Sequence, residues 1–296
     1  MTKYYAVIEA GGTKFRCAVM NEKKQILAQC RISTRAPVNT LAEVCDFFLQ
    51  QKVDIGHYTA LGIASFGPLD LNRASPNYGY ITNTPKPDWS WTSLAVPLAQ
   101  SLDCPVALDT DVNGAALAEY YWGAGQGHSV VIYITVGTGI GGGVIIDGKP
   151  LHGLIHPEIG HMLVPGNSSI SGVCPFHTNC AEGLASGAAM QKIWQQPAES
   201  LALDHKAWDI EAQILSQLCH NLLISYSPQK IIFGGGVLEN EHLIPSMITK
   251  TERSLADYLC LPKSVALNDI IVPTGLGQDS GILGAFALAQ SHAKTI

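Results

Sequence analysis

The order of apolar and polar positions predicts alternating strands and helices from the start of the chain. Lys3 to Ala10 is rich in Tyr, Val and Ile, which favour strands, and the run Gly11-Gly12-Thr13-Lys14 interrupts it. The apolar pattern resumes from Phe15 to Met20, which indicates a hairpin. Thr40 to Gln51 has the apolar spacing of a helix, and Ala60 to Ser65 has the composition of a buried strand.

The same opening pattern returns in the second half of the chain. Ser129 to Val136 is apolar and β-branched, a glycine-rich run from Gly137 to Gly143 interrupts it, and Val144 to Asp147 resumes a strand. Two strand–glycine turn–strand units therefore predict a duplicated architecture with two related halves. The remaining expected elements are helices at Leu94 to Ser101 and Asn113 to Trp122, a strand at Pro105 to Leu108, a long helical region at Gly183 to Tyr226, a strand at Ile231 to Phe233, and a helix at Ser280 to Ser291.

Composition excludes several classes of protein. Hydrophobic residues make up 47% of the 296 positions and charged residues 14%, against the usual ~25%, so a disordered chain is excluded. The net charge is −6 and no basic block is present, so we expect no nucleic-acid partner. The longest apolar run is far shorter than the ~20 residues that span a bilayer, so we expect no membrane partner. The 8 cysteines are scattered, which indicates a reduced, cytoplasmic protein.

Three glycine clusters each follow an apolar strand. Glycine allows successive backbone N–H groups to approach phosphate oxygens closely, but tight hairpin turns explain the same residues. One cluster, Gly137-x-Gly139-x-x-Gly142, matches the dinucleotide fingerprint. That motif requires a helix after the glycines, and a strand follows here, so a dinucleotide site is excluded.

A possible general base lies between a predicted strand and a predicted helix. Asp111 is in the segment Asp109-Thr110-Asp111-Val112-Asn113. A carboxylate at a strand end can accept a proton from a hydroxyl during phosphoryl transfer. Aspartate is also a common helix N-cap, and the residues alone leave both interpretations open. Asp109 is the rival base, and we expect it to be structural.

Two histidines and two cysteines have the spacing of a metal site. Three of these residues lie within one short loop, and two thiolates with two imidazoles suit a closed, tetrahedral, structural zinc site. Unrelated thiols near histidines remain the alternative. The predicted ligands are His161, Cys174, His177 and Cys180.

The three glycine clusters, taken in order, resemble the ROK family of sugar kinases over essentially the whole chain. The matching segments are Glu9 to Lys14, Thr135 to Gly143, and Phe233 to Val237, which look like two phosphate loops and an adenosine loop. The resemblance implies an α/β, two-domain actin-like ATPase (ribonuclease H-like) fold with an interdomain cleft. It also implies a smaller domain at 1–112, a larger one with the zinc loop at 113–279, and a C-terminal helix at about 280–296 that packs back on the first.

The resemblance implies ATP, Mg²⁺ and structural Zn²⁺ as cofactors, a sugar and ATP as partners, and a homodimer. The acid that opens the family motif is usually Asp and is Glu9 here, and the Asn before the catalytic Asp is Thr110 here. The family's catalytic base falls on Asp111. The implied nucleotide-binding residues are Gly11, Gly12, Thr13, Lys14, Gly137, Thr138, Gly139, Gly141, Gly235 and Gly236.

Sugar binding is assigned partly by residue chemistry and partly by the resemblance. Carboxylates accept paired hydrogen bonds from vicinal hydroxyls, and the family places two acids and a histidine at the sugar. Gly67, the Asn83 amide and the Thr84 hydroxyl lie in loops that could line one side of the sugar site, although ordinary turn chemistry explains these residues equally. The implied set is Gly67, Asn83, Thr84, Asn113, Glu158, His161 and Glu182. We expect His152 and His156 at the loop surface.

The run Thr84-Pro85-Lys86-Pro87-Asp88-Trp89 resembles the fructokinase-like branch, in which Cys174-Pro175-Phe176-His177 also occurs. The expected enzyme is therefore a transferase of carbohydrate metabolism that converts fructose and ATP to fructose 6-phosphate. Kinases for glucose, mannose or an N-acetylhexosamine are the close alternative. A non-catalytic, sugar-responsive regulator is the alternative from a different class.

Overall fold

The computed structural model of the protein describes residues 2–165 and 169–293. It contains two compact units. Unit 1 comprises Met1–Ala118, His152–His156 and Asp279–Ile296, and unit 2 comprises Glu119–Leu151 and Pro157–Gln278. The short segment His152–His156 thus packs with unit 1, although its neighbours on both sides in the chain pack with unit 2.

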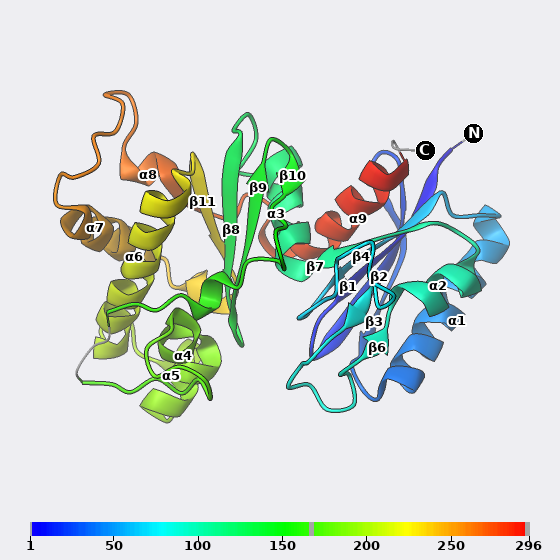
Figure 1. The fold of residues 1–296 in the computed structure, drawn as a ribbon, viewed down its shortest axis with the longest axis horizontal. Coiled ribbons are helices and arrows are strands. Elements are labelled where there is room, and N and C mark those ends of the chain that lie inside the picture. The colour runs from blue at the N-terminus through cyan, green and yellow to red at the C-terminus, as the bar shows by residue number, and fades with distance from the viewer. Residues whose placement is uncertain (1, 166–168, 294–296) are drawn as a thin grey trace. The chain divides into compact units, whose positions relative to one another are not determined.

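A five-stranded sheet forms the centre of unit 1, with strand order β3-β2-β1-β4-β7 (Figure 1). The strands β1, β2 and β3 form an antiparallel meander, and β4 and β7 continue the sheet parallel to β1. The bounds are β1 Tyr4–Ala10, β2 Lys14–Asn21, β3 Ile26–Ser33, β4 Ala60–Ser65 and β7 Val106–Thr110. A small separate sheet pairs β5 Tyr80–Ile81 with β6 Thr92–Ser93.

Unit 2 contains a second five-stranded sheet, with order β10-β9-β8-β11-β12. Again the first three strands form an antiparallel meander, and the last two continue parallel to β8. The bounds are β8 Val130–Val136, β9 Ile140–Ile146, β10 Lys149–Pro150, β11 Lys230–Gly234 and β12 Ile271–Pro273. Equal order and equal strand direction confirm the predicted duplication.

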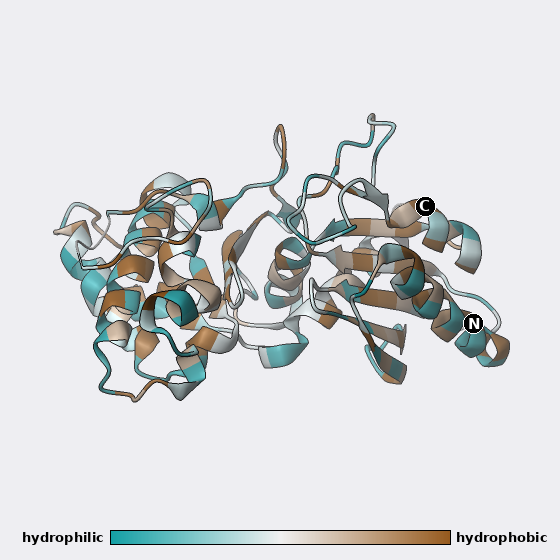
Figure 2. Ribbon diagram, turned by 90° about the horizontal axis from the view of Figure 1, so that it is seen from below, coloured by the Kyte–Doolittle hydropathy of each residue, from teal (hydrophilic) through white to brown (hydrophobic). Residues whose placement is uncertain are grey.

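Helices pack on these sheets through apolar faces (Figure 2). In unit 1, α9 contacts β1 and β4 so closely that a Cβ on Gly62 would lie 2.9 Å from the backbone nitrogen of Ala289. The helices are α1 Pro37–Ile55, α2 Ala95–Leu102, α3 Asp111–Trp122, α4 Ala181–Ala185, α5 Gly187–Trp194, α6 Lys206–Tyr226, α7 Leu243–Leu255, α8 Leu267–Ile270 and α9 Ser280–Ala293. Short 3-10 turns are η1 Ile159–His161, η2 Ala198–Ser200, η3 Gly236–Glu239 and η4 Gly277–Asp279.

Each unit has its own hydrophobic core. In unit 1 the strands pack Ile8 and Ile63 against Phe48 of α1. In unit 2 the strands pack Ile134 and Phe233 among the buried side chains of α6. The two clusters share no residue, so each sheet is stabilised by the apolar surface that its own helices bury.

Two sequence predictions about element bounds were wrong. The single helical region at Gly183 to Tyr226 is three helices, because the Ser186 hydroxyl caps α5 and the His205 ring caps α6. The glycine run that was expected to be a turn is largely strand, since β9 begins at Ile140 and Gly141 pairs with Thr135. Glycine occurs inside β9 because a Cβ on Gly142 would lie 2.9 Å from Ile134 and Ile159.

Glu119, near the C-terminal end of α3, fixes a loop of unit 2. Its buried carboxylate accepts hydrogen bonds from the backbone nitrogens of Ala124 (2.9 Å), Gly275 (3.1 Å) and Leu276 (3.1 Å), and also from the Thr274 hydroxyl. Removing these acceptors would leave three backbone N–H groups and one hydroxyl without this partner, so the carboxylate anchors the segment after β12.

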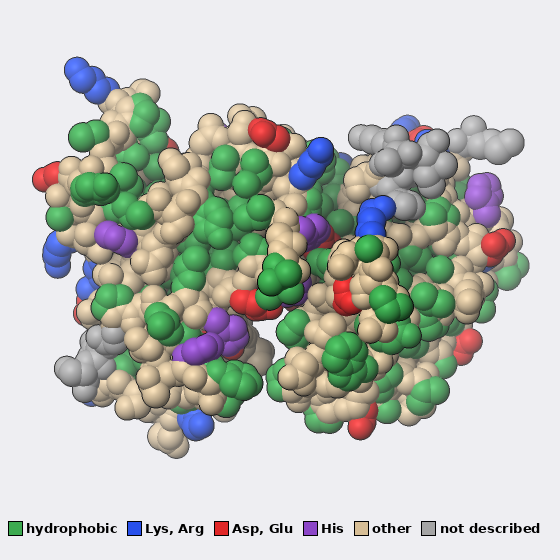
Figure 3. Space-filling view, in the orientation of Figure 1, with side chains coloured by type: hydrophobic (Ala, Val, Ile, Leu, Met, Phe, Trp, Pro, Cys, Tyr) green, Lys and Arg blue, Asp and Glu red, His purple; other side chains and the backbone are tan. Residues whose placement is uncertain are grey.

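Charged side chains lie singly on the face shown in Figure 3, as the low charged content predicts. Among residues 2–165 and 169–293, no helix has both the length and the apolar composition needed to cross a membrane.

Candidate functional site

The turn between β1 and β2 exposes backbone at the end of the unit-1 sheet. Gly11 donates its N–H to the Lys14 carbonyl at 3.0 Å, which closes the turn, and Gly12, Thr13 and Lys14 are exposed. Thr34, just after β3, holds the turn by donating its hydroxyl to the Gly11 carbonyl at 2.7 Å. The amides of Gly12 and Thr13 and the Lys14 ammonium are therefore accessible to an anion.

Glu9 lies at the end of β1, directly before this turn. Its carboxylate accepts from Arg16 at 3.2 Å, and Arg16 also pairs with Asp279 at 3.1 Å. Burial raises the pKa of Glu9, and the positive charges of Arg16 and Lys14 oppose that rise. The carboxylate is thus fixed by Arg16 beside the glycine turn.

The turn between β8 and β9 is the equivalent feature of unit 2. Gly137 donates to the Gly139 carbonyl at 2.9 Å, and Thr138 at its tip is exposed. Glu182 holds the far side of the turn, because its Oε2 accepts from the Ile140 nitrogen at 3.0 Å. Gly141, predicted as part of the loop, is a residue of β9.

The third glycine cluster lies against the end of β8. Gly235 has a positive φ of 95°, and a Cβ there would lie 2.6 Å from the Val136 carbonyl carbon. Glycine is required at this position for both reasons. The structure therefore brings Gly235 beside Val136, the last residue of the strand that leads into Gly137.

The junction of β7 and α3 resolves which residue caps the helix. Thr110 Oγ1 accepts from the Asn113 nitrogen at 3.2 Å, so Thr110 is the N-cap of α3. Asp111 is the first helical residue, is partly exposed, and accepts from the Val112 nitrogen at 2.9 Å. Because Thr110 supplies the cap, the N-cap interpretation of Asp111 is wrong.

Asp109 is buried and forms a network with Asn113 and His152. Its Oδ1 accepts from the Asn113 side-chain nitrogen at 2.7 Å, and its Oδ2 lies 3.0 Å from Nε2 of His152. The hydrogen bond to Asp109 raises the pKa of His152 above its ordinary value of 6.5, although burial opposes the rise. Asn113 Oδ1 is buried and has no hydrogen-bond partner among the described residues, so it remains able to accept one.

Sequence reasoning missed the roles of two histidines. His156 was expected at the surface but is 7% exposed, and its Nε2 accepts from the Leu69 nitrogen at 3.3 Å beside the Gly67 loop. His152 is 40% exposed at its side chain, yet its Nε2 edge is fixed by Asp109. Both contacts join residues distant in sequence, and no local spacing could have indicated them.

The loop that contains Asn83 and Thr84 ends at a buried tryptophan. Trp89 is fully buried and donates its indole N–H to the Arg35 carbonyl at 2.8 Å. Asn83 is exposed, whereas the Thr84 hydroxyl accepts from the Lys86 nitrogen at 3.4 Å. The Asn83 amide is therefore the more accessible of the two predicted sugar ligands.

The four predicted metal ligands lie together in unit 2. Their ligand atoms are all within 4.8 Å of one another, and they are His161, Cys174, His177 and Cys180. Nδ1 of His161 is buried and has no hydrogen-bond partner in the described part of the chain. Two thiols and two imidazoles grouped in this way, one imidazole with an unpartnered buried nitrogen, fit a tetrahedral zinc ion.

Two carboxylates flank this cluster. Glu158 is exposed and directly precedes η1, which ends at His161. Glu182 Oε1 lies 3.8 Å from Nε2 of His161, while its Oε2 holds the β8–β9 turn. Glu182 therefore connects the metal-ligand cluster to the glycine turn of the same unit.

Comparison with known proteins identifies the family. The model of the ROK family matches residues 5–292. The chain is 45% identical to a fructokinase of Zymomonas mobilis, with 97% of this chain and 96% of that protein covered.

Solved structures agree in fold. A ROK hexokinase from Thermus thermophilus superimposes with a TM-score of 0.80 and 26% identity, covering 99% of this chain and 100% of that one. A ROK family glucokinase from Streptomyces griseus, solved with glucose and AMPPNP, has a TM-score of 0.75 and 26% identity, with 98% and 100% covered. The two-unit α/β architecture with duplicated sheets is thus the actin-like ATPase fold of these kinases, and the chain belongs to the ROK family.

Proposed function

We propose that this protein is an ATP-dependent hexose kinase that phosphorylates fructose to fructose 6-phosphate. The observation that supports the substrate is the 45% identity, over 97% of the chain, to a relative that is a fructokinase. Two glycine turns at equivalent places in two equivalent sheets support the use of ATP, and a structural relative was solved with an ATP analogue.

Asp111 is the proposed general base. It is the first residue of α3, directly after β7, and it is partly exposed, while Thr110 supplies the helix cap. It accepts the proton of the attacking sugar hydroxyl as the bond from that oxygen to the γ-phosphorus forms and the bond from the γ-phosphorus to the bridging oxygen breaks, which releases ADP. Asp109 holds Asn113 and His152, which suits it to a positioning role.

The nucleotide phosphates bind to the two glycine turns. Backbone N–H groups and the Lys14 ammonium supply the positive potential, while Gly235 and Gly236 allow the adenosine to approach the backbone. Mg²⁺ would neutralise the phosphate charge when bound, with Glu9 supporting it or Lys14. The proposed set is Gly11, Gly12, Thr13, Lys14, Gly137, Thr138, Gly139, Gly141, Gly235 and Gly236.

Sugar hydroxyls are bound by acceptors from several loops. Glu158 and Glu182 can each accept paired hydrogen bonds from vicinal hydroxyls, and Asn113 Oδ1 is a buried acceptor without a partner. The remaining proposed contacts are Gly67, Asn83, Thr84 and His161. We further propose that structural Zn²⁺ shapes the loop that bears Glu158 and Glu182. Its ligands would be His161, Cys174, His177 and Cys180.

Three expectations from the sequence stay predictions. They are the homodimer, the cytoplasmic location, and the division into domains at 1–112 and 113–279 with the helix at about 280–296. Of that helix, residues 294–296 lie outside the described residues.

Coupled ADP release with Mg-ATP tests the function across fructose, mannose, glucose and N-acetylhexosamines. We expect the highest kcat/KM on fructose and a loss of about 10²- to 10⁴-fold in Asp111→Asn. The matched control is Asp103→Asn, an exposed residue with positive φ that asparagine tolerates. A relative at 30% identity is an N-acetylgalactosamine kinase, so preference for that sugar would refute the assignment to fructose. Full activity in Asp111→Asn would refute the proposed base.

A further inference from the structure

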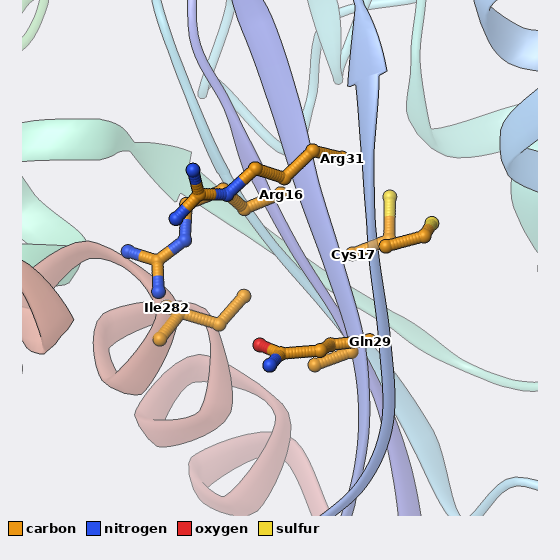
Figure 4. Close-up of a pocket in the computed structure, with 7 residues that line it drawn as sticks. Arg16, Cys17, Gln29, Arg31 and Ile282 are labelled. Atoms are coloured by element: carbon orange, nitrogen blue, oxygen red, sulfur yellow. The ribbon is translucent and has the colours of Figure 1, made fainter.

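A cavity of about 330 Å³ lies beside β2, β3 and the first turn of α9 in unit 1 (Figure 4). Its lining includes Arg16, Gln29, Arg31 and Ile282. None of the lining residues belongs to the Gly11–Lys14 turn. The cavity is therefore a feature distinct from the proposed phosphate site.

Strand register places the polar lining on one face of the sheet. Arg16 lies directly opposite Arg31 in the β2–β3 ladder, and Ala18 lies opposite Gln29 two positions further along. Figure 4 shows the two guanidinium groups side by side above Ile282, with the Gln29 amide on the same side. Like charges directly opposite each other on antiparallel strands are destabilising, so this pair needs a compensating interaction.

The acids nearby compensate only one of the two arginines. Arg16 pairs with Glu9 at 3.2 Å and with Asp279 at 3.1 Å. The Arg31 side chain has no acidic partner within the part of the chain that the structure describes. The cavity thus has one guanidinium held in place and a second whose charge is unbalanced.

We propose that this cavity binds a small phosphorylated metabolite, with the phosphate group between Arg16 and Arg31 and the organic part toward Gln29. Guanidinium groups bind phosphate oxygens through paired N–H donors. The volume exceeds that of a phosphate ion and lies at the lower end of the ~300–1,000 Å³ typical of ligand pockets. Gln29 offers both a donor and an acceptor to hydroxyl groups of the ligand.

Arg16 connects the cavity to the first glycine turn. The same guanidinium donates a hydrogen bond to Glu9, and only Ala10 separates Glu9 from the glycine turn. An anion that binds Arg16 competes with Glu9 for its donors, and this competition would change the apparent KM for Mg-ATP. Only this kinetic effect rests on the proposed kinase function, because binding to the cavity does not require catalysis.

Isothermal titration of the full chain with glycerol 3-phosphate tests the proposal. The protein is first saturated with a non-hydrolysable Mg-ATP analogue, whose own binding is measured, so that the glycine turns are occupied. We expect one saturable site per chain, and at least about tenfold weaker binding in Arg31→Gln, since a charged hydrogen-bonding pair is lost. Arg35→Gln is the matched control, because Arg35 is also an exposed arginine of unit 1 and pairs with Glu43.

Several results would overturn the proposal. They are the absence of saturable binding, equal affinity in the wild type and Arg31→Gln, or an equal loss in Arg35→Gln, which would indicate a general charge effect. A second variant, Arg31→Lys, keeps the charge and removes the planar donor pair, and we expect it to bind with intermediate affinity. If the ATP analogue does not bind, that result counts against the proposed kinase function and not against the cavity. The cavity can then be titrated with glycerol 3-phosphate in the absence of the analogue.

Discussion

The turn between β1 and β2 and the turn between β8 and β9 connect equivalent strands of two sheets with the same topology. Their supports differ. In unit 1, Thr34 holds the turn through the Gly11 carbonyl, and an ion-paired Glu9 precedes it. In unit 2, Glu182 holds the turn through the Ile140 nitrogen and lies beside the metal-ligand cluster.

This difference shows that a duplicated backbone does not require duplicated side-chain contacts. The ladder hydrogen bonds of each hairpin fix the turn in both units, because they depend on backbone atoms alone. The contacts that hold each turn come from loops outside the ladder, which differ between the units. The two turns should therefore respond to different perturbations. Three experiments test this difference, and a fourth tests the Asp109 network of unit 1.

The largest expected effect follows from removal of a proposed zinc ligand. Cys174→Ser should lose the metal and lower the free energy of unfolding by more than about 4 kcal/mol, since loss of a structural metal is among the largest single-residue effects. Hydrogen exchange should accelerate at the β8–β9 turn and remain unchanged at the β1–β2 turn.

Metal analysis and thermal melting measure this effect, and Cys260→Ser is the control because Cys260 is exposed and outside the cluster. We expect about one zinc per chain in the wild type and in the control. An unchanged Tm in Cys174→Ser would contradict a structural metal.

The next effect concerns the support of the unit-2 turn itself. Glu182→Ala removes the acceptor that the Ile140 nitrogen uses at 3.0 Å, which should cost about 1–3 kcal/mol of stability. The proposed loss of a sugar contact should also raise the KM for the sugar. Chemical unfolding and steady-state kinetics measure the two effects separately, and Glu182→Gln should retain more stability because its amide oxygen still accepts. Equal stability of Glu182→Ala and the wild type would show that the carboxylate does not support the turn.

Thr34→Val should have a smaller effect on the equivalent turn of unit 1. The change keeps the shape of the side chain and removes one neutral hydrogen bond to the Gly11 carbonyl, which is worth about 0.5–1.5 kcal/mol. The KM for Mg-ATP should rise, while the KM for the sugar should change less than in Glu182→Ala. A larger destabilisation than in Glu182→Ala would reverse the proposed ranking of the two supports.

The smallest effect is a pH dependence in unit 1. Because the folded-state pKa of His152 is raised above 6.5, its pairing with Asp109 stabilises the fold fully below pH 6.5, and that stability is lost as pH rises through the folded pKa. The side chain is 40% exposed, so solvent screening should limit the contribution to under about 1 kcal/mol.

Urea unfolding of the wild type and of His152→Gln at several pH values measures this contribution. The stability difference between the two proteins should be larger near pH 6 than near pH 9. His57→Gln is the control, because the His57 side chain is outside the Asp109 network. A difference that does not vary with pH would show that the pair does not titrate with folding.

Much of the architecture followed from local pattern. The strand at Ala60 to Ser65 has the predicted bounds, and the two glycine turns lie where the apolar runs are interrupted. Local pattern failed at Gly141 to Gly143, which belong to β9, and at Gly142 glycine is required by the close packing of Ile134 and Ile159 and not by a turn. Local pattern left two interpretations of Asp111 open, since the sequence did not show that the Thr110 hydroxyl would supply the cap.

The strand and turn order, the duplication, and the spacing of His161, Cys174, His177 and Cys180 could be read from the amino-acid sequence, because hydrogen bonding and side-chain periodicity act over short stretches of chain. Three features depend on tertiary packing: Asp109 pairs with His152, His156 is buried at Leu69, and the unbalanced Arg31 lines a cavity with Arg16. The contacts of both histidines join residues far apart in sequence, and the cavity also needs α9 from the C-terminal end of the chain. Their geometry depends on how the helices and loops pack on each sheet, which no local pattern encodes.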